Sequence, residues 1–580
     1  MKNAVLSELF EQMADIMEIL GEDRFRINSY RKVARVIGDI PIDVEVLLGS
    51  GELARTPGIG KSSLAKIEEF YKTGAITAHR QLLAKIPPTL VELLAIPGMG
   101  PKGVKAVYEQ LKVESIAGLK STIATGELAK LPGFGDKKAT IIARGIEFLE
   151  RSTGRIRLDQ ALEAAEMVTG LLRGHPGIRS IQPAGSLRRC AETIGDVDIL
   201  VAVGRRKGAA EQIIEAFTGA PFVEQVLASG PTKGSAVIYT EGAPVQVDVR
   251  VVPQASFGAA AQYFTGSKAH NVRLREIAVK AKLKLNEYGL FRGEKMIAGA
   301  EEPRIYEKLG LDYIDPLLRE DRGEVEAAGE HRLPELIELE DIKGDMHVHS
   351  VASDGMSTVP ELAEAARNNG YKYICITDHS QSSAIANGQS PKQLAAQIEH
   401  IHRLAGKTRG ITILAGVEVD ILADGRLDFD DGLLAELDFV IASIHSGMGG
   451  PRERVTMRTL KAMDSPYVNC IAHPTGRLLG QREPMDLDME AVIKHASKTQ
   501  TALEVNANPW RLDLKDIHCR MAVEAGVKLV IGTDAHSAGG LGLMGFGVAT
   551  AARGWVTRAH ILNTRPLSEI KGWVKAKRPK

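Results

Sequence analysis

The sequence predicts a multidomain protein with an all-α N-terminal region, an α+β middle region and a C-terminal (β/α) barrel. Three observations predict this order. The first 155 residues hold three Pro-Gly-apolar-Gly turns between stretches with helical periodicity, at 56–63, 96–103 and 131–138. Residues 181–252 are strand-like. Beyond residue 341, apolar runs alternate with helical stretches, as βα units do, and this part holds 11 of the 15 histidines.

Composition excludes several classes of protein. With 580 residues, 44% hydrophobic and 25% charged, the chain is long enough for about four domains and is neither disordered nor a small disulfide scaffold. Lys+Arg 73 balances Asp+Glu 73, so no whole-chain charge attracts a partner. The four cysteines form no Cys-x-x-Cys pair and are expected to be free thiols: Cys190, Cys375, Cys470 and Cys519. No signal peptide or membrane-length apolar run occurs, so we expect a cytoplasmic protein without membrane association.

The three glycine turns each precede a helix that carries Lys or Ser in its first turn. Glycine lets backbone N–H groups approach an anion closely, and a helix N-terminus favours negative charge. The alternative is that glycine only ends one helix and begins the next. Three copies favour phosphate binding, and the segments resemble helix-hairpin-helix motifs, which contact the nucleic-acid backbone. The resemblance implies DNA contacts at Gly58, Gly60, Gly98, Gly100, Gly133 and Gly135.

Three aspartates in the middle region form a candidate metal site. Asp196 and Asp198 share one face of a strand, since alternate residues point the same way. Asp248 lies in a second apolar strand, on the face that also carries Gln246 and Arg250. An Asp-x-Asp alone is usually a solvated strand end, but a third carboxylate favours a metal. Two Mg²⁺ or Mn²⁺ ions would activate a 3′-hydroxyl and neutralise a leaving pyrophosphate.

The surrounding residues resemble a known polymerase family. Gly185-Ser186, Arg188-Arg189, Asp196-x-Asp198 and Asp248 resemble the palm of family X DNA polymerases, the group that includes DNA polymerase beta. AQYFTGSKAHNVRLREIA and LNEYGL resemble that family's nucleotide-selection subdomain, or thumb. Cys190 departs from the family, because a glycine commonly follows the arginine pair there, and Lys268 replaces an acidic residue found in some relatives.

The resemblance assigns roles to these residues. Asp196, Asp198 and Asp248 would be catalytic, and Glu287 would support Arg189 or its neighbours. Ser186 and Arg189 would bind the triphosphate, since arginine forks onto phosphate oxygens. The other implied nucleotide contacts are Gly185, Tyr263, Phe264, Gly266, Asn271 and Arg275. In this set Tyr263, Phe264 and Gly266 would line the sugar, while Asn271 and Arg275 would reach the nascent pair and the template.

The N-terminal region also resembles the small lyase-type domain of the same family. Lys66 matches a lysine that forms a Schiff base with 5′-deoxyribose phosphate. A nucleophilic lysine needs a lowered pKa, which Arg26, Tyr30, Lys61 and Arg31 are candidates to supply. The alternative is a helical lysine that only binds a 5′-phosphate, and it is equally consistent with the sequence.

Beyond residue 341, seven strand candidates end in polar residues. The carboxyl ends of barrel strands meet at one mouth, so these side chains should converge. Nine residues at or just after these strand ends have side chains that can bind a metal: His347, His349, Asp354, His379, Glu418, His445, His473, Asp534 and His536. A single histidine at a strand end is usually a core residue whose hydrogen bonds are satisfied, but His, Asp or Glu at six consecutive strand ends is not accidental. Nine nitrogen and oxygen ligands suit three Mn²⁺, Zn²⁺ or Fe²⁺ ions, with Glu418 as the bridge.

This run resembles the PHP (polymerase and histidinol phosphatase) domain. The resemblance implies one ion at His347, His349, Glu418 and Asp534, a second at Asp354, His379 and His536, and a third at Glu418, His445 and His473. Arg477 is either a phosphate ligand or a surface arginine.

The resemblance covers nearly the whole chain, in the order of bacterial family X DNA polymerases with a fused PHP domain. It implies an all-α helix-hairpin-helix region, an α+β polymerase-beta-like palm and thumb, and a distorted (β/α)7 PHP barrel. The expected divisions are 1–85 (lyase-like), 86–155 (helical DNA-binding), 156–252 (palm), 253–318 (nucleotide selection), 319–341 (linker) and 342–575 (PHP barrel).

The expected function is filling of short gaps in base excision repair. A Mn²⁺-dependent 3′–5′ exonuclease or 3′-end phosphoesterase would occupy the barrel, holding Mn²⁺ or Zn²⁺, and 5′-deoxyribose phosphate or AP-site processing is a further expectation. The expected partners are gapped or primed DNA and deoxynucleoside triphosphates, and the protein is expected to be a monomer. The alternatives are a nucleotidyltransferase acting on another substrate, and a barrel that is a small-molecule phosphatase or a structural appendage.

Overall fold

The structure is a computed structural model that describes residues 3–39, 44–56, 58–96, 99–152, 155–240, 243–405 and 408–579. It divides into two compact units. The first comprises Met1–Gly154 with Gly480–Glu483, and the second comprises Arg155–Leu479 with Pro484–Lys580. None of the helices in the described ranges combines the length and apolar composition needed to cross a membrane.

The first unit is all-helical, as predicted. On α1 the side chains of Leu6, Phe10, Met13 and Met17 are fully buried, because residues three and four apart share one helix face. This face packs against α2 and α6. The elements are α1 (Asn3–Leu20), α2 (Arg24–Asp39), α3 (Val44–Ser50), η1 (Leu53–Arg55), α4 (Lys61–Thr73), α5 (Thr77–Leu83), η2 (Pro88–Ala95), α6 (Pro101–Leu111), α7 (Ile116–Ala124), α8 (Glu127–Lys130) and α9 (Gly135–Ser152).

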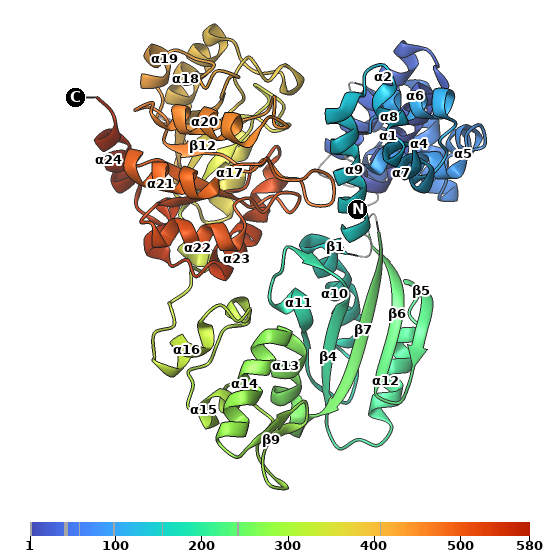
Figure 1. The fold of residues 1–580 in the computed structure, drawn as a ribbon, viewed down its shortest axis with the longest axis vertical. Helices are drawn as coiled ribbons and strands as arrows, with labels where there is room; N and C mark the ends of the chain where they lie inside the picture. The colour runs from blue at the N-terminus through green and yellow to red at the C-terminus, as the bar shows by residue number, and fades with distance from the viewer. Residues whose placement is uncertain are drawn as a thin grey trace. The chain divides into compact units, whose positions relative to one another are not determined.

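The second unit begins with a five-stranded sheet in the order β2-β4-β7-β6-β5 (Figure 1). β4 and β7 are parallel and the other neighbours are antiparallel. Its elements are β1 (Ile156–Arg157), α10 (Leu158–Leu172), β2 (Ile178–Pro183), α11 (Gly185–Arg188), β3 (Thr193–Ile194), β4 (Val197–Val203), α12 (Ala209–Thr218), β5 (Val223–Ser229), β6 (Lys233–Thr240) and β7 (Ala243–Pro253).

Strand β4 separates two environments. Val197, Ile199 and Val201 are buried in a core shared with α10 and α12. Leu200, on the opposite face, packs with Ala260 and Ala261 of α13 (Phe257–Thr265). The period-two alternation therefore places the even-numbered residues of β4 on the face away from α10 and α12.

The thumb and the segment that leads to the barrel follow the sheet. Their elements are η3 (Gln254–Ser256), α13 (Phe257–Thr265), α14 (Lys268–Lys280), β8 (Lys284–Asn286), β9 (Gly289–Arg292), β10 (Lys295–Ala298), α15 (Glu302–Lys308), η4 (Pro316–Leu318), α16 (Glu324–Gly329) and η5 (Leu339–Asp341). The last two lie in the range expected to be a linker, 319–341. Val325 and Ala328 of α16 are buried in the same core as Leu274 and Ile305, so the first part of this range packs against the thumb.

The C-terminal part is a seven-stranded parallel sheet whose strands follow chain order, as predicted for a barrel. A parallel bridge between Val348 and Ala535 joins its first and last segments. The strands are β11 (Gly344–Val348), β12 (Tyr373–Ile376), β13 (Thr412–Asp420), β14 (Phe439–Ser443), β15 (Cys470–Ile471), β16 (Ala502–Asn506) and β17 (Leu529–Gly532).

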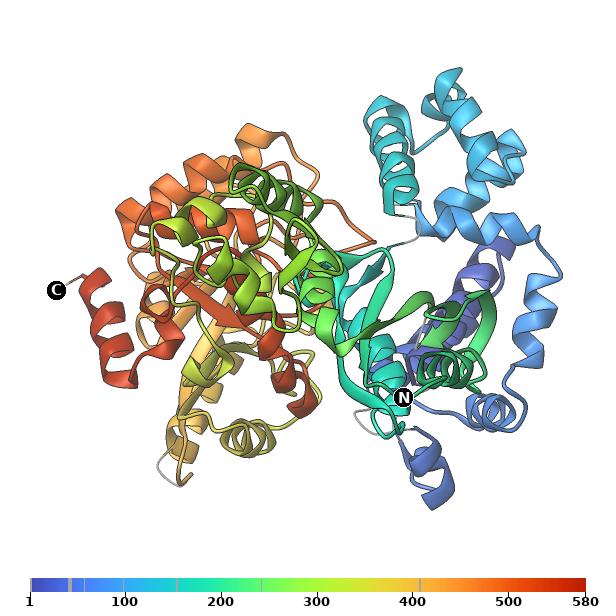
Figure 2. The same ribbon diagram turned by 90° about the horizontal axis from the view of Figure 1, so that it is seen from below.

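Helices surround these strands. They are α17 (Val359–Asn368), η6 (Ala384–Ala386), α18 (Pro391–Ala405), α19 (Asp431–Ala435), α20 (Arg452–Met463), α21 (Met489–Thr499), α22 (Asp516–Glu524), η7 (Ala538–Leu543), α23 (Met544–Arg553), η8 (Arg558–His560), η9 (Leu562–Thr564) and α24 (Leu567–Lys577). Ile570 and Val574 of α24 pack with Tyr373 and Phe439, the first residues of two strands. Helix α24, next to the C label in both views, therefore covers the amino ends of these strands (Figures 1 and 2).

Candidate active sites

The palm carboxylates converge. Asp198 of β4 is the register partner of Asp248 of β7, and both lie within 4.8 Å of Asp196, counted between ligand atoms. Burial and the charges of Asp196 and Asp248 raise the pKa of Asp198 to about 7. Burial alone would raise the pKa of Asp248, but hydrogen bonds from Lys233 and Ser235 lower it. Three carboxylates crowded in this way fit divalent cations with oxygen ligands.

Gly185 lets the α11 turn approach the carboxylates. A Cβ on Gly185 would lie 2.6 Å from Oδ2 of Asp198, and its φ is +61°. The close approach and the positive φ both require glycine. Ser186 follows it and is half-buried. Cys190 also has a positive φ, 47°, which accounts for the glycine common at this point in the family that the sequence resembles.

The two arginines after this turn are held by carboxylates. Arg188 Nη2 lies 2.7 Å from Glu302 Oε2, and Arg189 Nε lies 3.0 Å from Glu320 Oε1. Glu287 was expected to support Arg189 or its neighbours, but the carboxylates that pair with these two arginines are Glu302 and Glu320. Both acids lie more than a hundred residues away in the sequence, and only the folded thumb brings them to the arginines.

The predicted nucleotide-selection residues form a connected group. The rings of Tyr263 and Phe264 meet edge to face with centroids 5.1 Å apart. Asn271 Nδ2 donates to the Tyr263 carbonyl at 2.7 Å, and Arg275 Nε donates to the Asn271 carbonyl at 3.2 Å. Gly266 has a φ of +68° and ends α13.

The glycine turns precede helices, as predicted. Gly60 and Gly100 are the residues before α4 and α6, and Gly135 begins α9. Gly58, Gly133 and Gly135 have positive φ values of +102°, +83° and +59°. Gly98 lies outside the described residues.

Lys66 lies on α4 and its Nζ donates to Ser62 Oγ at 2.9 Å. The same nitrogen lies 5.6 Å from the ring centre of Tyr30. Arg31, another of the residues considered beside the lysine, pairs with Asp15 and Glu18 at 2.9 and 2.6 Å.

All nine predicted barrel ligands converge at the carboxyl ends of the strands. Ligand atoms lie within 4.8 Å of one another in three groups, which are His347, His349 and Asp534; His349, Asp354, His379 and His536; and His379, Glu418 and His445. His473 joins them through Glu418, whose Oε1 lies 2.9 Å from His473 Nε2. Three features differ from the expected partition: His349 and His379 are each shared between two groups, Glu418 belongs to only one group, and His473 is in none of them.

The electrostatics of this cluster favour cations. Burial lowers the pKa of His349 to about 3, and the nearby His536 and His379 act in the same direction. A neutral imidazole keeps the lone pair that a metal needs. Burial would lower the pKa of His445, but the Glu418 carboxylate raises it to about 10. The Glu418 carboxylate therefore favours positive charge beside it.

Buried atoms without hydrogen-bond partners give a test of the fit to metal. Among the described residues, His349 Nδ1, His379 Nδ1 and Glu418 Oε2 are buried and make no hydrogen bond. Buried polar atoms without hydrogen bonds are costly, and metal coordination would satisfy them. The nitrogen and oxygen donors without thiolate fit Mn²⁺ or Zn²⁺.

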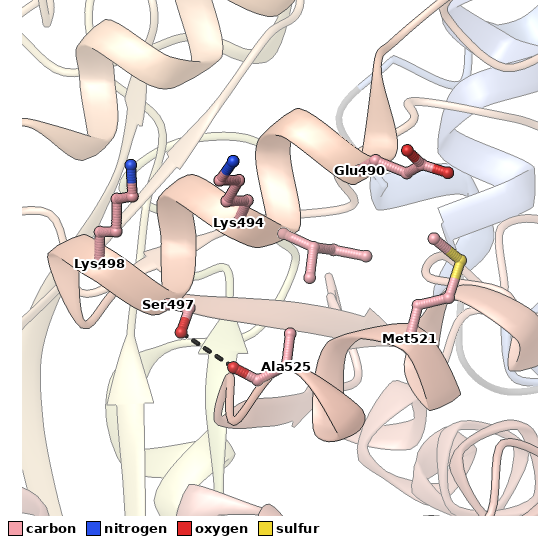
Figure 3. Close-up of a pocket in the computed structure, with 7 residues that line it drawn as sticks. Glu490, Lys494, Ser497, Lys498, Met521 and Ala525 are labelled. Carbon is pink, nitrogen blue, oxygen red and sulfur yellow. Dashed lines mark hydrogen bonds between the residues drawn. The ribbon is translucent and has the colours of Figure 1, made fainter.

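A separate pocket lies between α21 and α22 (Figure 3). Lys494 and Lys498 project from α21, and Ser497 donates to the Ala525 carbonyl at 2.9 Å. None of its lining residues belongs to the two clusters.

Four known families match parts of the chain. The Helix-hairpin-helix domain family matches residues 1–76, and the SAM-like Helix-hairpin-helix tandem family matches residues 90–146. The DNA polymerase beta thumb family matches residues 260–320, and the PHP domain family matches residues 345–507.

Similarity to one bacterial protein extends over almost the whole chain. The DNA polymerase/3′-5′ exonuclease PolX of Bacillus subtilis (strain 168) is 38% identical over 569 residues, which are 98% of each chain. The chain belongs to the bacterial family X DNA polymerases with a PHP domain. The resemblance and the fold class predicted from sequence are thereby confirmed.

Smaller proteins match part of this family X chain. A probable phosphatase of Thermoanaerobacter sp. (strain X514) is 31% identical over 251 residues, 41% of this chain and 96% of that protein. A probable phosphatase of Syntrophotalea carbinolica (strain DSM 2380 / NBRC 103641 / GraBd1) is 30% identical over 230 residues, 38% of this chain and 90% of that protein.

The sequence analysis missed the residues that orient the barrel histidines in this family X chain. Glu504 Oε1 lies 2.6 Å from His347 Nδ1, and Asp420 Oδ1 lies 3.1 Å from His445 Nδ1. These contacts turn each Nε2 toward the cluster. Glu504 carries a weak signal in sequence, because it lies two residues before the strand end at Asn506 and therefore shares its face.

Arg511 lies beside the barrel cluster, whereas the arginine considered from the sequence was Arg477. Arg477 is buried and donates to the carbonyls of Arg511 and Leu512, so it supports a loop. Arg511 lies on that loop, with Nε 3.4 Å from Asp534 Oδ2. Only the fold brings Arg511 to the cluster.

Proposed function

We propose that this family X polymerase extends the 3′ end of a DNA primer in the palm and shortens a 3′ end in the barrel. The observation that carries the proposal is the presence of two separate ligand clusters in one chain. The palm has three converging carboxylates, and the barrel has nine nitrogen and oxygen ligands. The Bacillus subtilis relative is named for both activities.

In the palm, Asp196, Asp198 and Asp248 would hold two Mg²⁺ or Mn²⁺ ions. These ions would supply Lewis-acid activation of the 3′-hydroxyl and neutralise charge at the triphosphate. Ser186 and Arg189 bind the triphosphate, because a hydroxyl and a guanidinium both donate to phosphate oxygens. Gly185 leaves room for the nucleotide beside Asp198.

In the thumb, Tyr263, Phe264 and Gly266 contact the sugar of the incoming nucleotide. Asn271 and Arg275 reach the minor-groove side of the new pair and the template. The hydrogen bonds among these residues support the proposal, since they hold the recognition surface in one arrangement before the nucleotide binds.

In the barrel, the ligand set would hold up to three Mn²⁺ or Zn²⁺ ions. They would polarise the phosphodiester and activate water for its hydrolysis. Glu418 is suited to bridge them, because its Oε1 lies 2.9 Å from His473 and 3.3 Å from His445 while its Oε2 lies 3.1 Å from His379. Glu504 holds His347 in the tautomer whose Nε2 can bind a metal.

The substrate proposed for both sites is gapped or primed DNA, with deoxynucleoside triphosphates for the palm. The glycine turns support contact with the DNA backbone, and a formal net charge of +0 predicts modest, salt-sensitive binding. Filling of short gaps in base excision repair follows from pairing a 3′-end trimming site with an extending site. We propose that the protein acts as a monomer.

Lys66 is proposed to bind the 5′-phosphate at the gap. The second role proposed for the same side chain is Schiff-base lyase chemistry on 5′-deoxyribose phosphate or an AP site. Borohydride trapping on a 5′-deoxyribose phosphate end separates the two. A covalent adduct lost in Lys66→Ala would establish the lyase, and weaker DNA binding without an adduct would establish phosphate binding alone.

A second function for the barrel is hydrolysis of small phosphate monoesters. Relatives named probable phosphatases support it, because their aligned lengths of 251 and 230 residues are close to the length of the barrel. Release of phosphate from a chromogenic monoester, without shortening of DNA, would favour this function.

The test uses a gapped duplex with a 5′-labelled primer in Mn²⁺, with and without deoxynucleoside triphosphates. We expect Asp196→Ala/Asp198→Ala to lose extension and keep shortening. We expect His347→Ala/His349→Ala to do the reverse. Shortening that survives in both variants would show that the barrel is not the nuclease.

A further inference from the structure

A barrel arginine lies against the palm residue proposed to bind the triphosphate. Arg553 is the last residue of α23, and its side chain is 9% exposed. Its Nη1 donates to the backbone carbonyl of Arg189. Its Nη2 lies 3.0 Å from Glu320 Oε1 and 3.0 Å from Asp516 Oδ2. The barrel therefore contacts the palm directly at the nucleotide-binding arginine.

Glu320 is shared between two arginines. The same Oε1 that accepts from Arg553 also lies 3.0 Å from Arg189 Nε. The side chains of Arg189 and Glu320 are 14% and 19% exposed, so water screens these charges only weakly. The second end of the Arg189 guanidinium donates to the Thr265 carbonyl. Two of the five N–H donors of Arg189 are thereby occupied, so a triphosphate that binds through Nε and Nη1 takes the guanidinium away from Glu320 and Thr265.

Asp516 keeps Arg553 in place. Its Oδ2 lies 3.0 Å from Arg553 Nη2 and 2.9 Å from Arg322 Nη1. The groups thus form an alternating row of arginines and carboxylates, in which each carboxylate contacts two arginines. Such a row can lose an end member without leaving a carboxylate unpaired.

We propose that Arg553 is a positioning residue for nucleotide binding, which retains Glu320 when Arg189 turns from Glu320 to the triphosphate. The inference rests on the proposed function, since it takes Arg189 as a triphosphate ligand. Removing one partner from a buried ion pair leaves an uncompensated charge at high cost. Because Glu320 keeps Arg553, Arg189 can leave at lower cost. The bond from Arg553 to the Arg189 carbonyl keeps the main chain of Arg189 in place meanwhile.

The test is steady-state insertion of one nucleotide into a one-nucleotide gap. In Arg553→Met, Glu320 has only Arg189 and holds it more firmly. We expect the KM for the nucleotide to rise about tenfold, the effect of losing one charged hydrogen bond, with kcat changed by less than about twofold. In Glu320→Gln/Arg553→Met no carboxylate retains Arg189, and the KM should return to within about twofold of that of the wild type.

Two comparisons make the test specific. Arg565→Met is the matched control, because Arg565 pairs with Glu569 within the barrel at 3.0 Å and should leave the KM unchanged. Shortening of the primer by every variant reports an intact barrel. If Arg553→Met also lowers the melting temperature, Glu320→Gln is compared with the double variant. Equal KM values support the inference, and a higher KM in the double variant overturns it.

Other outcomes overturn the inference directly. An unchanged KM in Arg553→Met shows that Arg189 does not depend on Arg553. A raised KM that Glu320→Gln does not reverse shows that Arg553 only supports the backbone. Failure of the wild type to insert any nucleotide refutes the proposed function itself, and is thereby distinguished from failure of the inference.

Discussion

Substitution of Glu302 by glutamine should strongly destabilise the thumb. Glu302 Oε1 lies 2.5 Å from Arg319 Nη1, and the two side chains are 7% and 0% exposed. Glu302 Oε2 lies 2.7 Å from Arg188 Nη2. Arg319 also donates to the Ile314 carbonyl at 2.9 and 2.8 Å. The substitution therefore leaves a fully buried guanidinium without the carboxylate that balances its charge.

The magnitude follows from this burial. Breaking a buried pair by removing one partner costs about 3–5 kcal/mol. Glutamine keeps a carbonyl oxygen that can accept one hydrogen bond, so we expect the lower value, about 3 kcal/mol, or roughly a 150-fold shift in the local opening equilibrium. Glu302→Leu/Arg319→Met removes both charges and should recover part of the loss.

Hydrogen–deuterium exchange of peptides covering 302–318 measures this stability locally, which suits a multidomain chain that need not unfold in one step. Glu307→Gln is the control on the same helix. Its side chain is 53% exposed and pairs with Arg304, so exchange should stay unchanged. Exchange in Glu302→Gln as slow as in the control would refute the reasoning.

Three further predictions follow from named contacts. Burial alone would raise the pKa of Glu302, but Arg319 and Arg188 lower it. The stabilisation by Glu302 is therefore present above the pKa of an unfolded glutamate, about 4.3, and is lost as the pH falls through the lower pKa of the folded state. Hydrogen–deuterium exchange of the thumb should accelerate in that acidic range, and exchange that does not change with pH would contradict this prediction. Gly185→Ala places a Cβ 2.6 Å from Asp198 Oδ2 and should slow primer extension about 10- to 100-fold without changing 3′ shortening, and normal extension would exclude the clash. Glu504→Gln weakens the hydrogen bond at His347 Nδ1 and should weaken Mn²⁺ binding about 10- to 100-fold by calorimetry, whereas wild-type affinity would show that Glu504 does not orient the ligand.

Local patterns determined much of this protein in advance. Period-two alternation predicted that Asp198 and Ile199 point to opposite faces of β4, and in the structure Ile199 lies in the core shared with α10 and α12. The nine barrel ligands were visible because parallel strands all end at one mouth, so a polar residue after each apolar run is enough to gather them. The glycine turns before α4, α6 and α9 were visible because two glycines in a tight turn are a strong local signal.

The tertiary structure alone decided which distant side chains support these sites. Glu320 instead of Glu287 holds Arg189, and Arg511 instead of Arg477 lies beside Asp534. Such pairings depend on where a loop or helix returns after a hundred or more residues, and no periodicity encodes that return. Sequence therefore determines which groups carry the chemistry, since ligand type and strand position are local properties. The fold determines which charges hold those groups, since electrostatic contacts depend on distance in space.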